Sequence, residues 1–328
     1  MTYGIAIVGG GRVAHAHARA IQSLPDLFAL RAIVDTDPQR ATALAAQYGC
    51  DGMTDFQRVL ERADVAVVAI GTPNHLHAPM TRAAITAGKH VFVEKPMALT
   101  LDDCDSMIAA ARAAGVKLLV GQTQHFFANN IRAHQIISAG ELGQLAMLSD
   151  TWYKPFGIEQ RLPWFLDRAF GGGMWHMNGA HMVDRMLWFA GSPVVAVKAW
   201  IGSPLLQQAS DDAAMVFLQH ASGLCSTIVH AGYRVGVERW EAEFVCTDGM
   251  LKLSTFAPNR GLWVSRDGGY TAIDTEEHNP FAYELALFGA AIRDDTPEPI
   301  APDYARQIVA VLLAAEQSVA SGREVLLG

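Results

Sequence analysis

The fold is decided by the stretch Gly4-Ile5-Ala6-Ile7-Val8-Gly9-Gly10-Gly11-Arg12-Val13-Ala14. Its first five residues are an apolar run typical of a buried parallel strand, and the alanine-rich residues 12–23 predict a helix. The six residues from Gly9 match the pattern G-x-G-x-x-A. Gly9 permits a tight turn, Gly11 lets the backbone approach a pyrophosphate, and Ala14 lets the helix pack closely on the strand. The stretch therefore predicts a dinucleotide site at the start of a helix, where free N–H groups and the helix dipole favour phosphates.

An acidic residue completes this pattern. The second strand, expected at 30–34, leads to Asp35, which lies 26 residues after Gly9. Its carboxylate can accept hydrogen bonds from the adenosine ribose hydroxyls and would repel a 2′-phosphate. We therefore expect NAD as the cofactor, with NADP as the alternative. Arg12 and Val13, in the first turn of the helix, are expected to contact the cofactor as well.

Strands and helices alternate as far as residue 122. The helices are marked by N-cap residues (Asp37 before Pro38, and Asn74) and by terminal glycines (Gly88 and Gly115). The expected strands cover residues 4–8, 30–34, 65–70, 90–93 and 117–120. This alternation predicts a doubly wound parallel sheet in a first domain, residues 1–122.

The pattern changes after Gly121, which sets the predicted domain boundary. Helices are expected at about 127–138 and 175–190, and a strand at about 145–153. Several strands then follow without helices between them, and two helices close the chain: strands 194–201, 213–219, 224–230, 240–246 and 250–253, and helices of about 280–293 and 303–320. Uninterrupted strands imply antiparallel pairing. We therefore expect an α/β protein whose second domain, residues 123–328, contains an open, mainly antiparallel sheet and serves substrate binding and oligomerisation.

Composition excludes several classes of protein. The chain has 328 residues, which favours two domains, and its net charge of 25 − 33 = −8 argues against binding to nucleic acid or an anionic membrane. No basic leader precedes the first strand, and the apolar runs fall far short of the roughly 20 residues that cross a bilayer. The four cysteines form no CxxC pair, which argues against a cysteine-based zinc site and a disulfide scaffold. His176 and His181, five residues apart, are poorly spaced as two ligands on a helix, so we expect no metal site. Without a leader or a membrane span, we expect a cytoplasmic location.

Two further motifs carry a resemblance to a known family. Gly71-Thr72-Pro73-Asn74-His75-Leu76-His77 follows one predicted strand, and Ala87-Gly88-Lys89-His90-Val91-Phe92-Val93-Glu94-Lys95-Pro96 spans the next. With the glycine turn, they resemble the glucose-fructose oxidoreductase / inositol 2-dehydrogenase (Gfo/Idh/MocA) family over nearly the whole chain. The resemblance implies a Rossmann domain, an α/β domain whose open sheet often forms a subunit interface, and a nicotinamide cofactor in the cleft between them. It implies cofactor contacts at Gly71, Thr72, Asn74, His77 and Gln122. For Asn74, a helix N-cap role is equally compatible.

Lys95 is the candidate catalytic residue. It lies just past the carboxyl end of a predicted parallel strand, where α/β sheets place ligands. A lysine in a partly dry cleft can exchange protons near neutrality. In the family, the matching lysine contacts the substrate hydroxyl that is oxidised. The Glu94 side chain should point to the opposite face and is assigned to cofactor or positioning contacts. The alternative for Lys95 is a solvated lysine after a strand.

A third motif departs from the family. Gly171-Gly172-Gly173-Met174-Trp175-His176-Met177-Asn178-Gly179-Ala180-His181-Met182-Val183-Asp184 resembles its GGGxxxDxGxHxxD segment, with Met177 in place of the first Asp. In many members that Asp and the His work with the lysine on the reacting hydroxyl, but methionine cannot ionise. His181 remains the candidate acid–base partner, because an imidazole titrates near pH 6.5; the alternative is a buried structural histidine. The role of the missing Asp passes to His176, to Asn178 or to a substrate group, or is dispensable.

The predicted substrate wall is the aromatic, arginine-containing segment 161–170. The Trp164 ring can pack on a substrate ring, and Arg161 can hold a carboxylate. An interdomain or oligomer contact is the alternative reading of this segment. Tyr153, His230 and Arg234 are further pocket candidates without a motif.

These features predict an NAD(P)-dependent oxidoreductase. It would transfer a hydride between nicotinamide and a ring secondary alcohol of a small-molecule substrate: a sugar, an inositol or a related cyclic polyol. The resemblance implies a homodimer or homotetramer formed through the C-terminal sheet. Three alternatives stay open: a dehydrogenase of a carboxylated or aromatic dihydrodiol-type alcohol, a redox-neutral lyase or hydrolase with tightly bound NAD, and a non-catalytic NAD-binding regulator.

Overall fold

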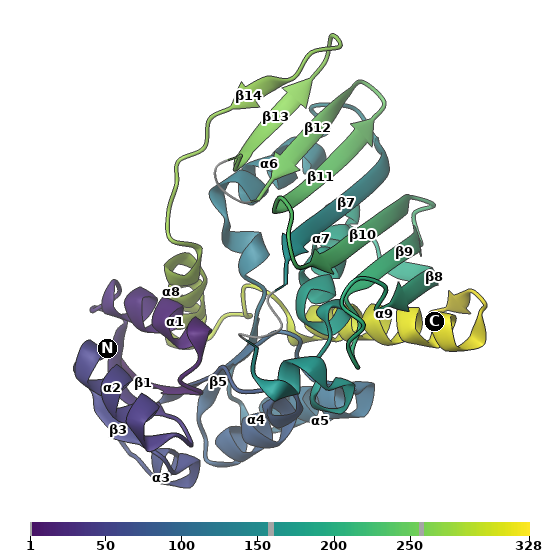
Figure 1. The fold of residues 1–328 in the computed structure, drawn as a ribbon. Helices are drawn as coiled ribbons and strands as arrows, with labels where there is room; N and C mark the ends of the chain where they lie inside the picture. The colour runs from purple at the N-terminus through teal and green to yellow at the C-terminus, as the bar shows by residue number, and fades with distance from the viewer. Residues whose placement is uncertain (1, 157–160, 256–258) are drawn as a thin grey trace. The chain divides into compact units, whose positions relative to one another are not determined.

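The structure, a computed structural model, describes residues 2–156, 161–255 and 259–328 and divides into two compact units (Figure 1). Unit 1 comprises Met1–Phe126 and Asn279–Arg306, and unit 2 comprises Phe127–His278 and Gln307–Gly328. A single division at residue 122 does not describe these units, because a late segment returns to unit 1. Its helix α8 (Pro280–Arg293) buries Leu285 and Phe288 in the same apolar core as the first strand.

Unit 1 contains a six-stranded sheet in the order β3-β2-β1-β4-β5-β6, with every pair parallel. Its strands are β1 (Tyr3–Val8), β2 (Phe28–Val34), β3 (Asp51–Met53), β4 (Val67–Ile70), β5 (His90–Glu94) and β6 (Leu118–Gly121). The predicted doubly wound parallel sheet is thereby confirmed. The strand order reverses between β1 and β4, and in such sheets ligands bind at the carboxyl ends of the strands beside that point.

The helices of unit 1 cover this sheet and are α1 (Arg12–Gln22), α2 (Pro38–Tyr48), α3 (Phe56–Leu60), α4 (His77–Thr86), α5 (Leu101–Ala114) and α8. Asp37 caps α2 as predicted, by accepting hydrogen bonds from the amides of Gln39 and Arg40. The expected cap at Asn74 is wrong. A 3₁₀ turn (Asn74–Leu76) comes first, so the N-cap of α4 is Leu76, and Asn74 itself is buried. Strand β3 and helix α3 were not predicted, because three to five residues carry too little periodicity.

Unit 2 is built on a nine-stranded sheet in the order β14-β13-β12-β11-β7-β10-β9-β8-β15. Its strands are β7 (Leu145–Pro155), β8 (Val194–Gly202), β9 (Ala213–His220), β10 (Cys225–Tyr233), β11 (Arg239–Cys246), β12 (Gly249–Ser254), β13 (Gly261–Ser265), β14 (Thr271–Ile273) and β15 (Val325–Leu326). The pairing is mainly antiparallel, as expected, but β7 and β10 pair in parallel. The last three strands had not been predicted.

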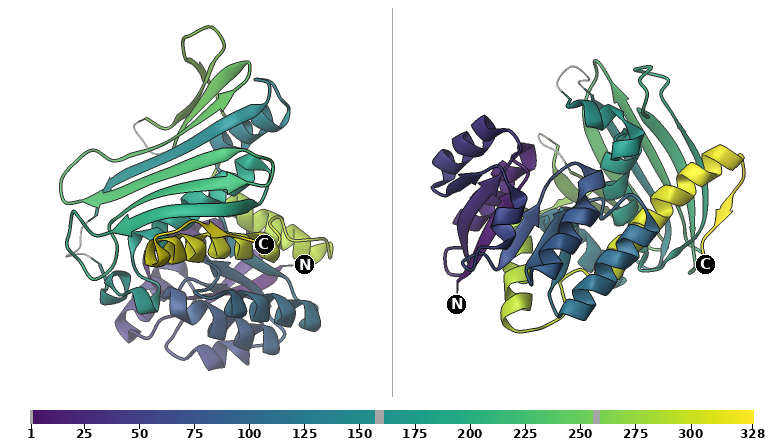
Figure 2. Two further views of the ribbon diagram at one scale, coloured as in Figure 1. Left: turned by 90° about the vertical axis from the view of Figure 1, so that its right-hand side faces the viewer. Right: turned by 90° about the horizontal axis from the view of Figure 1, so that it is seen from below.

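One face of this sheet is covered by helices. The helices of unit 2 are α6 (Ala128–Ser138), α7 (Ala180–Ala190) and the larger part of α9 (Pro302–Ser321). Figure 2 shows these helices on one side of the sheet. Burial alternates along β9 and β10, so one face of the sheet is apolar core and the other faces outward. The outward face carries large apolar side chains, with Trp200 and Met215 roughly half exposed.

The helix expected over 175–190 is not a continuous α-helix. Its first five residues, Trp175–Gly179, form a π turn, and regular α-helix begins at Ala180. Such turns are rare and frequently lie at functional sites. Within the described residues, no helix is long and apolar enough to span a membrane.

Candidate active site

The glycine turn after β1 has the geometry of a phosphate-binding turn. Gly9 has a φ of +100°, and a Cβ atom added there would lie 2.5 Å from the carbonyl oxygen of Gly71. Helix α1 begins directly afterwards with Gly11 as its N-cap, and it has no side-chain cap and no acidic residue in its first turn. A Cβ added at Gly11 would have nothing within 4 Å. The first-turn amides of Arg12 and Val13 are thus available to an anionic ligand, with no acidic side chain of the first turn competing for them.

The Asp35 carboxylate stabilises this glycine turn through hydrogen bonds. Its carboxylate accepts a hydrogen bond from the amide of Gly10 at 2.7 Å and one from the amide of Asp37 at 2.9 Å. The Arg40 guanidinium also approaches both carboxylate oxygens at 3.2 Å. A carboxylate has about four acceptor positions, so a ribose hydroxyl can bind here only by displacing Arg40. Arg40 is partly exposed and can move.

The loops after β4 and β6 present buried polar atoms. Because β1, β4, β5 and β6 are parallel neighbours, their carboxyl ends meet at one edge of the sheet. There the Thr72 hydroxyl and the Gln122 side-chain oxygen have no hydrogen-bond partner among the described residues. Buried polar atoms are nearly always paired, so these two atoms fit a bound group with hydrogen-bonding capacity. With the open glycine turn, they fit a dinucleotide such as NAD.

Glu94 is the last residue of strand β5 at this edge, and Lys95 follows it. Glu94 accepts a hydrogen bond from His17 at 2.8 Å and a longer one, 3.3 Å, from the amide of Lys95. Burial alone would raise the pKa of Glu94, but the His17 hydrogen bond and the nearby positive charges outweigh it and lower that pKa. Glu94 is therefore an anion turned toward α1, and it holds the backbone from which the half-buried Lys95 projects.

His77 ties two of these loops together. Its Nδ1 lies 2.8 Å from the Pro96 carbonyl oxygen and its Nε2 lies 3.0 Å from that of Thr72. The side chain is fully buried, and this burial lowers its pKa. Because both ring nitrogens face backbone carbonyls, His77 positions the loops after β4 and β5.

In unit 2, the His176 side chain contacts Arg168 and Glu316. The Arg168 guanidinium donates to its Nε2 at 2.6 Å, and the Glu316 carboxylate lies 3.3 Å from the same nitrogen. Arg168 also forms an ion pair with Glu316. Burial, and then the charge of Arg168, hold the pKa of His176 well below its usual value. This arrangement fastens the π turn to α9.

His181 lies in the first turn of α7, directly after the π turn. Its ring centroid lies 6.4 Å from that of Trp152 and 6.1 Å from that of Trp240. These two indoles stack on each other at 4.0 Å with their planes 2° apart. The partly buried Asn178, three residues earlier, has a side-chain nitrogen without a partner in the described part of the chain. His181 therefore offers a polar group beside an aromatic wall formed by Trp152 and Trp240, and Asn178 lies three residues before it in the same helical segment.

A buried ion pair under this wall was not predicted. Arg185 contacts Asp150 at 3.1 Å, and both side chains are fully buried. The indole nitrogen of Trp240 donates to Asp150 at 2.9 Å, and the Arg185 guanidinium stacks on the Trp240 ring. Burial raises the pKa of Asp150 to about 6 even so. The signal in the sequence was a charged residue inside an apolar strand and another inside an apolar helix.

The predicted substrate wall is half-buried. Trp164 stacks on Phe165 with ring centroids 3.9 Å apart, and the Arg161 guanidinium lies over Phe156 and Phe165. Of the three further candidates, Arg234 is exposed and Tyr153 lies on the outward side of β7, whereas His230 is buried.

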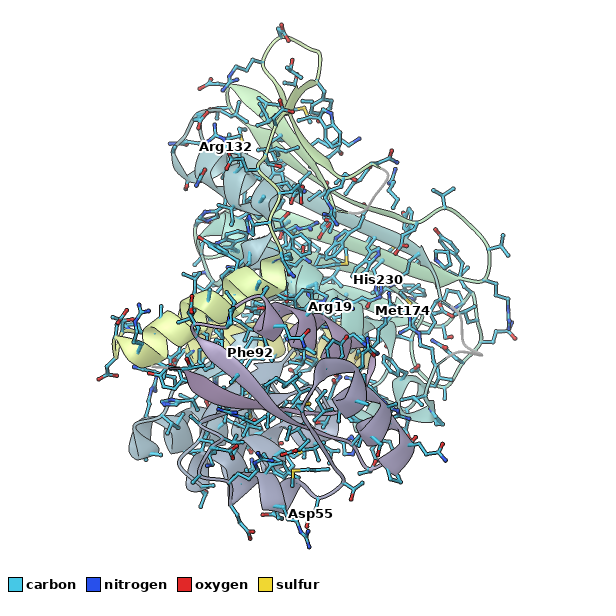
Figure 3. All side chains as sticks on the ribbon, turned by 90° about the vertical axis from the view of Figure 1, so that its left-hand side faces the viewer. Arg19, Asp55, Phe92, Arg132, Met174 and His230 are labelled. Atoms are coloured by element: carbon cyan, nitrogen blue, oxygen red, sulfur yellow. The ribbon has the colours of Figure 1, made fainter. Side chains whose placement is uncertain are left out.

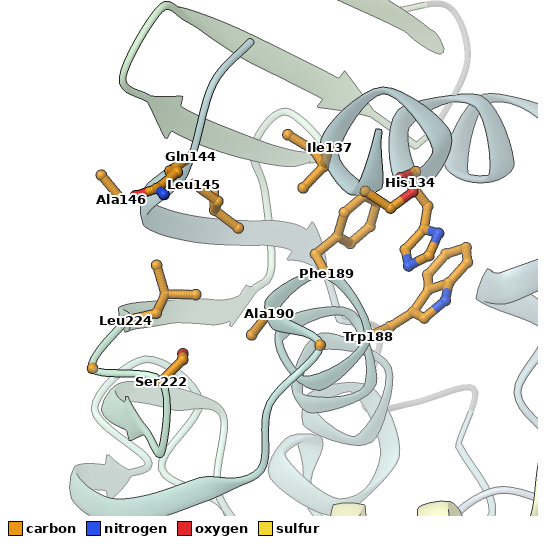
Figure 4. Close-up of a pocket in the computed structure, with 13 residues that line it drawn as sticks. His134, Ile137, Gln144, Leu145, Ala146, Trp188, Phe189, Ala190, Ser222 and Leu224 are labelled. Atoms are coloured by element: carbon orange, nitrogen blue, oxygen red, sulfur yellow. Dashed lines mark hydrogen bonds between the residues drawn. The ribbon is translucent and has the colours of Figure 1, made fainter. Parts of the chain in front are cut away.

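A separate cavity of about 570 Å³ lies between α6, α7 and the loop before β10 (Figure 4). Its lining includes the stacked pair His134 and Trp188. None of the predicted site residues lines it. In residues 2–156, 161–255 and 259–328, no group of three or more His, Cys, Asp or Glu side chains could hold a metal ion.

Comparison with known proteins identifies the family. Residues 3–122 match an oxidoreductase family with an NAD-binding Rossmann fold, and residues 131–252 match the GFO/IDH/MocA C-terminal domain. The inositol 2-dehydrogenase of Rhizobium meliloti is 27% identical over 99% of both chains.

Two further relatives are similar. The 1-carboxy-3-chloro-3,4-dihydroxycyclohexa-1,5-diene dehydrogenase of Comamonas testosteroni is 32% identical, over 62% of this chain and about half (52%) of that enzyme. The solved structure of the aldose-aldose oxidoreductase of Caulobacter crescentus is 27% identical, with a TM-score of 0.90 over the full length of both chains. Both matched domains, in the expected order along the chain, show that this protein belongs to the Gfo/Idh/MocA family of NAD-binding oxidoreductases.

Proposed function

We propose that this protein is an NAD-dependent dehydrogenase acting on a ring secondary alcohol of a sugar, an inositol or a related cyclic polyol. One observation carries the proposal. The carboxyl edge of one parallel sheet carries the uncapped glycine turn, Lys95, and the Thr72 and Gln122 oxygens that have no partner in the described part of the chain. This edge is where sheets of this type bind dinucleotides, and Lys95 is its candidate proton-transfer group.

The cofactor would be held by residues of unit 1. The amides of the glycine turn would bind the pyrophosphate, Asp35 the adenosine ribose, and Thr72 and Gln122 the nicotinamide end. Bound NAD supplies the hydride acceptor. His77 and Glu94 support this site by holding the loops and the backbone of Lys95.

Proton handling is assigned to Lys95 and His181. The amine of Lys95 would take the proton of the substrate hydroxyl as the carbon that bears this hydroxyl gives its hydride to the bound NAD. His181 would act as the second proton-exchanging group, since Met177 cannot. His176 is a structural residue in this proposal, because its Nε2 already accepts from Arg168. The Asn178 amide and the Trp164 ring would contact the substrate.

One observation favours a second candidate, a dehydrogenase of a carboxylated dihydrodiol. The Comamonas relative is named for such a compound, and Arg161 lies on the aromatic rings of the predicted substrate wall. An arginine is suited to a substrate carboxylate. The relatives named for inositol and aldose substrates match over nearly the whole chain and favour the polyol.

The test is an NADH-absorbance screen over inositols, aldoses and carboxylated cyclic diols with both cofactors. With the substrate it finds, Lys95→Ala should lower turnover at least ~100-fold, on the usual scale of general acid–base catalysis. NAD affinity, measured by calorimetry, should change little. Lys117→Ala, which removes an ion pair to the exposed Asp295, is the matched control and should keep full turnover. Near-normal turnover in Lys95→Ala would remove this lysine from the mechanism.

We also propose a homodimer or homotetramer formed through the outward face of the unit 2 sheet. Trp200 lies opposite Met215, and Met215 opposite Val229, so a row of apolar side chains crosses three neighbouring strands. Exposed rows of this kind usually mark an interface. Sedimentation velocity distinguishes the two assemblies. The four cysteines are free thiols, in keeping with the proposed cytoplasmic location.

A further inference from the structure

His230 is a buried histidine to which the proposed proton transfer assigns no role. It lies on β10, on the helix-covered face of the unit 2 sheet, and is 1% exposed. Neither of its ring nitrogens has a hydrogen-bond partner among the residues that the structure describes. Burying a polar group without a partner destabilises a protein, so natural proteins seldom keep one without a use for it.

The surroundings of His230 are those of the candidate substrate region. Its ring centroid lies 6.5 Å from that of Trp152, the same indole that His181 approaches at 6.4 Å. Two residues further along β10, Gly232 packs so closely on Met174 that an added Cβ would lie 2.2 Å from its sulfur. Met174 and His230 are both labelled in Figure 3. His230 thus shares the Trp152 indole as a neighbour with the proposed proton-exchanging histidine, and its strand packs on Met174 of the glycine-rich segment.

The protonation state of His230 limits what it can bind. Burial, together with the charge of Lys154, lowers its pKa to about 3. The ring is therefore neutral at physiological pH, with one nitrogen that donates and one that accepts. A hydroxyl group both donates and accepts, so it can pair with either nitrogen, whereas a carboxylate only accepts and can pair with the N–H nitrogen alone. The stacked pair Trp152 and Trp240 adds a flat apolar surface for the C–H face of a ring.

We propose that His230 is a specificity-determining residue that hydrogen-bonds a hydroxyl of the substrate ring, and that it selects a polyol over a carboxylated ring. This inference rests on the proposed dehydrogenase function and chooses between its two candidate substrates. His230 acts in binding and takes no part in the proton transfer assigned to Lys95 and His181.

The test compares His230→Leu with His230→Asn, which keeps one donor and one acceptor. The probes are myo-inositol and its monodeoxy analogues, measured as KM and kcat and by calorimetric binding to the NADH-loaded enzyme. His230→Leu should raise KM for myo-inositol about tenfold, the value of one or two hydrogen bonds. It should leave kcat within about threefold and NAD affinity unchanged, and His230→Asn should recover most of the KM. With the monodeoxy analogue that lacks the hydroxyl bound by His230, the wild type and His230→Leu should have equal KM values.

Stability separates this role from a structural one. Replacing an unpartnered buried group by an apolar one should leave the melting temperature equal or higher. Thr227→Val, on the opposite face of β10, is the control and should leave KM and kcat for myo-inositol unchanged. A lower melting temperature with unchanged KM would make His230 structural and overturn the inference, and an unchanged KM in an active His230→Leu enzyme would do the same. If the wild type neither binds nor oxidises any hydroxylated ring, the proposed function fails, and the role of His230 fails with it.

Discussion

Two glycine runs lead into helices in this molecule, one in each unit, and they are used in opposite ways. Gly9–Gly11 precedes α1, whose first turn has no side-chain cap. Gly171–Gly173 precedes the helical segment that begins at Trp175, and there the Asp211 carboxylate accepts a hydrogen bond from the Trp175 amide at 2.6 Å. The first helix start remains open to a ligand's phosphates, and the second is closed by the protein's own anion.

The space around the glycines is also open at Gly11 in the first run and filled at Gly172 and Gly173 in the second. A Cβ at Gly11 would meet nothing within 4 Å, whereas a Cβ at Gly173 would lie 2.1 Å from the Asp211 carboxylate. A Cβ at Gly172 would lie 2.4 Å from the Trp164 carbonyl oxygen. The second run therefore contains glycine so that protein can pack against it, and the first so that a ligand can. A glycine-rich pattern alone does not distinguish these uses; the position of the nearest carboxylate does.

The largest effects should come from adding a methyl group to each run. Gly173 has a φ of +93°, so Gly173→Ala adds backbone strain to the clash with Asp211 and should cost about 4 kcal/mol of unfolding free energy. Gly11 has a φ of −75°, so Gly11→Ala should fold normally, yet weaken NAD binding about tenfold, because its Cβ lies where the pyrophosphate approaches the backbone. Denaturant unfolding and calorimetry measure the two effects.

Each variant is the control for the other. The folded fraction of Gly173→Ala should bind NAD as the wild type does, and Gly11→Ala should keep the wild-type unfolding free energy. Equal losses of NAD affinity in both variants would show that the two runs do not differ in use.

The same contrast shows what the sequence could predict. The turn at Gly9 was predictable, because a strand, a helix and the residues between them dictate its backbone locally. Sequence also placed Lys95 at the end of β5 and thus at the carboxyl edge of the sheet. The closing role of Asp211 was not predictable, since it lies 36 residues from the amide that it caps. The isolation of His230 and the Asp150–Arg185 pair likewise depend on side chains that meet only in the folded chain.

The helix α8 was predicted with its correct limits, but its partner was not. Its apolar residues indicate that one face is buried, without indicating in which core. Leu285 and Phe288 join the core of unit 1, although the chain around them continues from unit 2. Hydrophobic periodicity describes an element, whereas domain membership depends on long-range packing.

A smaller effect, on the pH dependence of stability, should come from Asp211, the carboxylate at the closed helix start. Burial raises the pKa of Asp211 from its usual 3.8 to about 6. The native state thus binds this proton more tightly, and the stability it contributes is full below about pH 4 and is lost as pH rises through 6. Each pKa unit is worth about 1.4 kcal/mol. The free energy of unfolding of the wild type should therefore fall by about 3 kcal/mol because of this group as pH rises, and Asp211→Asn should abolish that fall. Denaturant unfolding at pH 4, 5, 6 and 7 measures it.

Asp150, with a similarly raised pKa, is unchanged in both proteins, so the difference between the two pH curves isolates Asp211. Parallel curves for wild type and Asp211→Asn would mean that the carboxylate at this helix start is not protonated in the native state.

The smallest effect concerns the carboxylate at the open turn. Asp35 accepts from Gly10 within the turn and leaves the helix amides uncovered, unlike Asp211. Asp35→Ala would remove the anion that repels a 2′-phosphate and free Arg40 to bind one, which should raise the NADP-to-NAD ratio of kcat/KM about fivefold. Asp35→Ala combined with Arg40→Ala is the matched control and should lose most of that gain. A wild-type enzyme that already prefers NADP would contradict the ribose role of Asp35, and with it the assignment of this carboxylate to the ligand and of Asp211 to the fold.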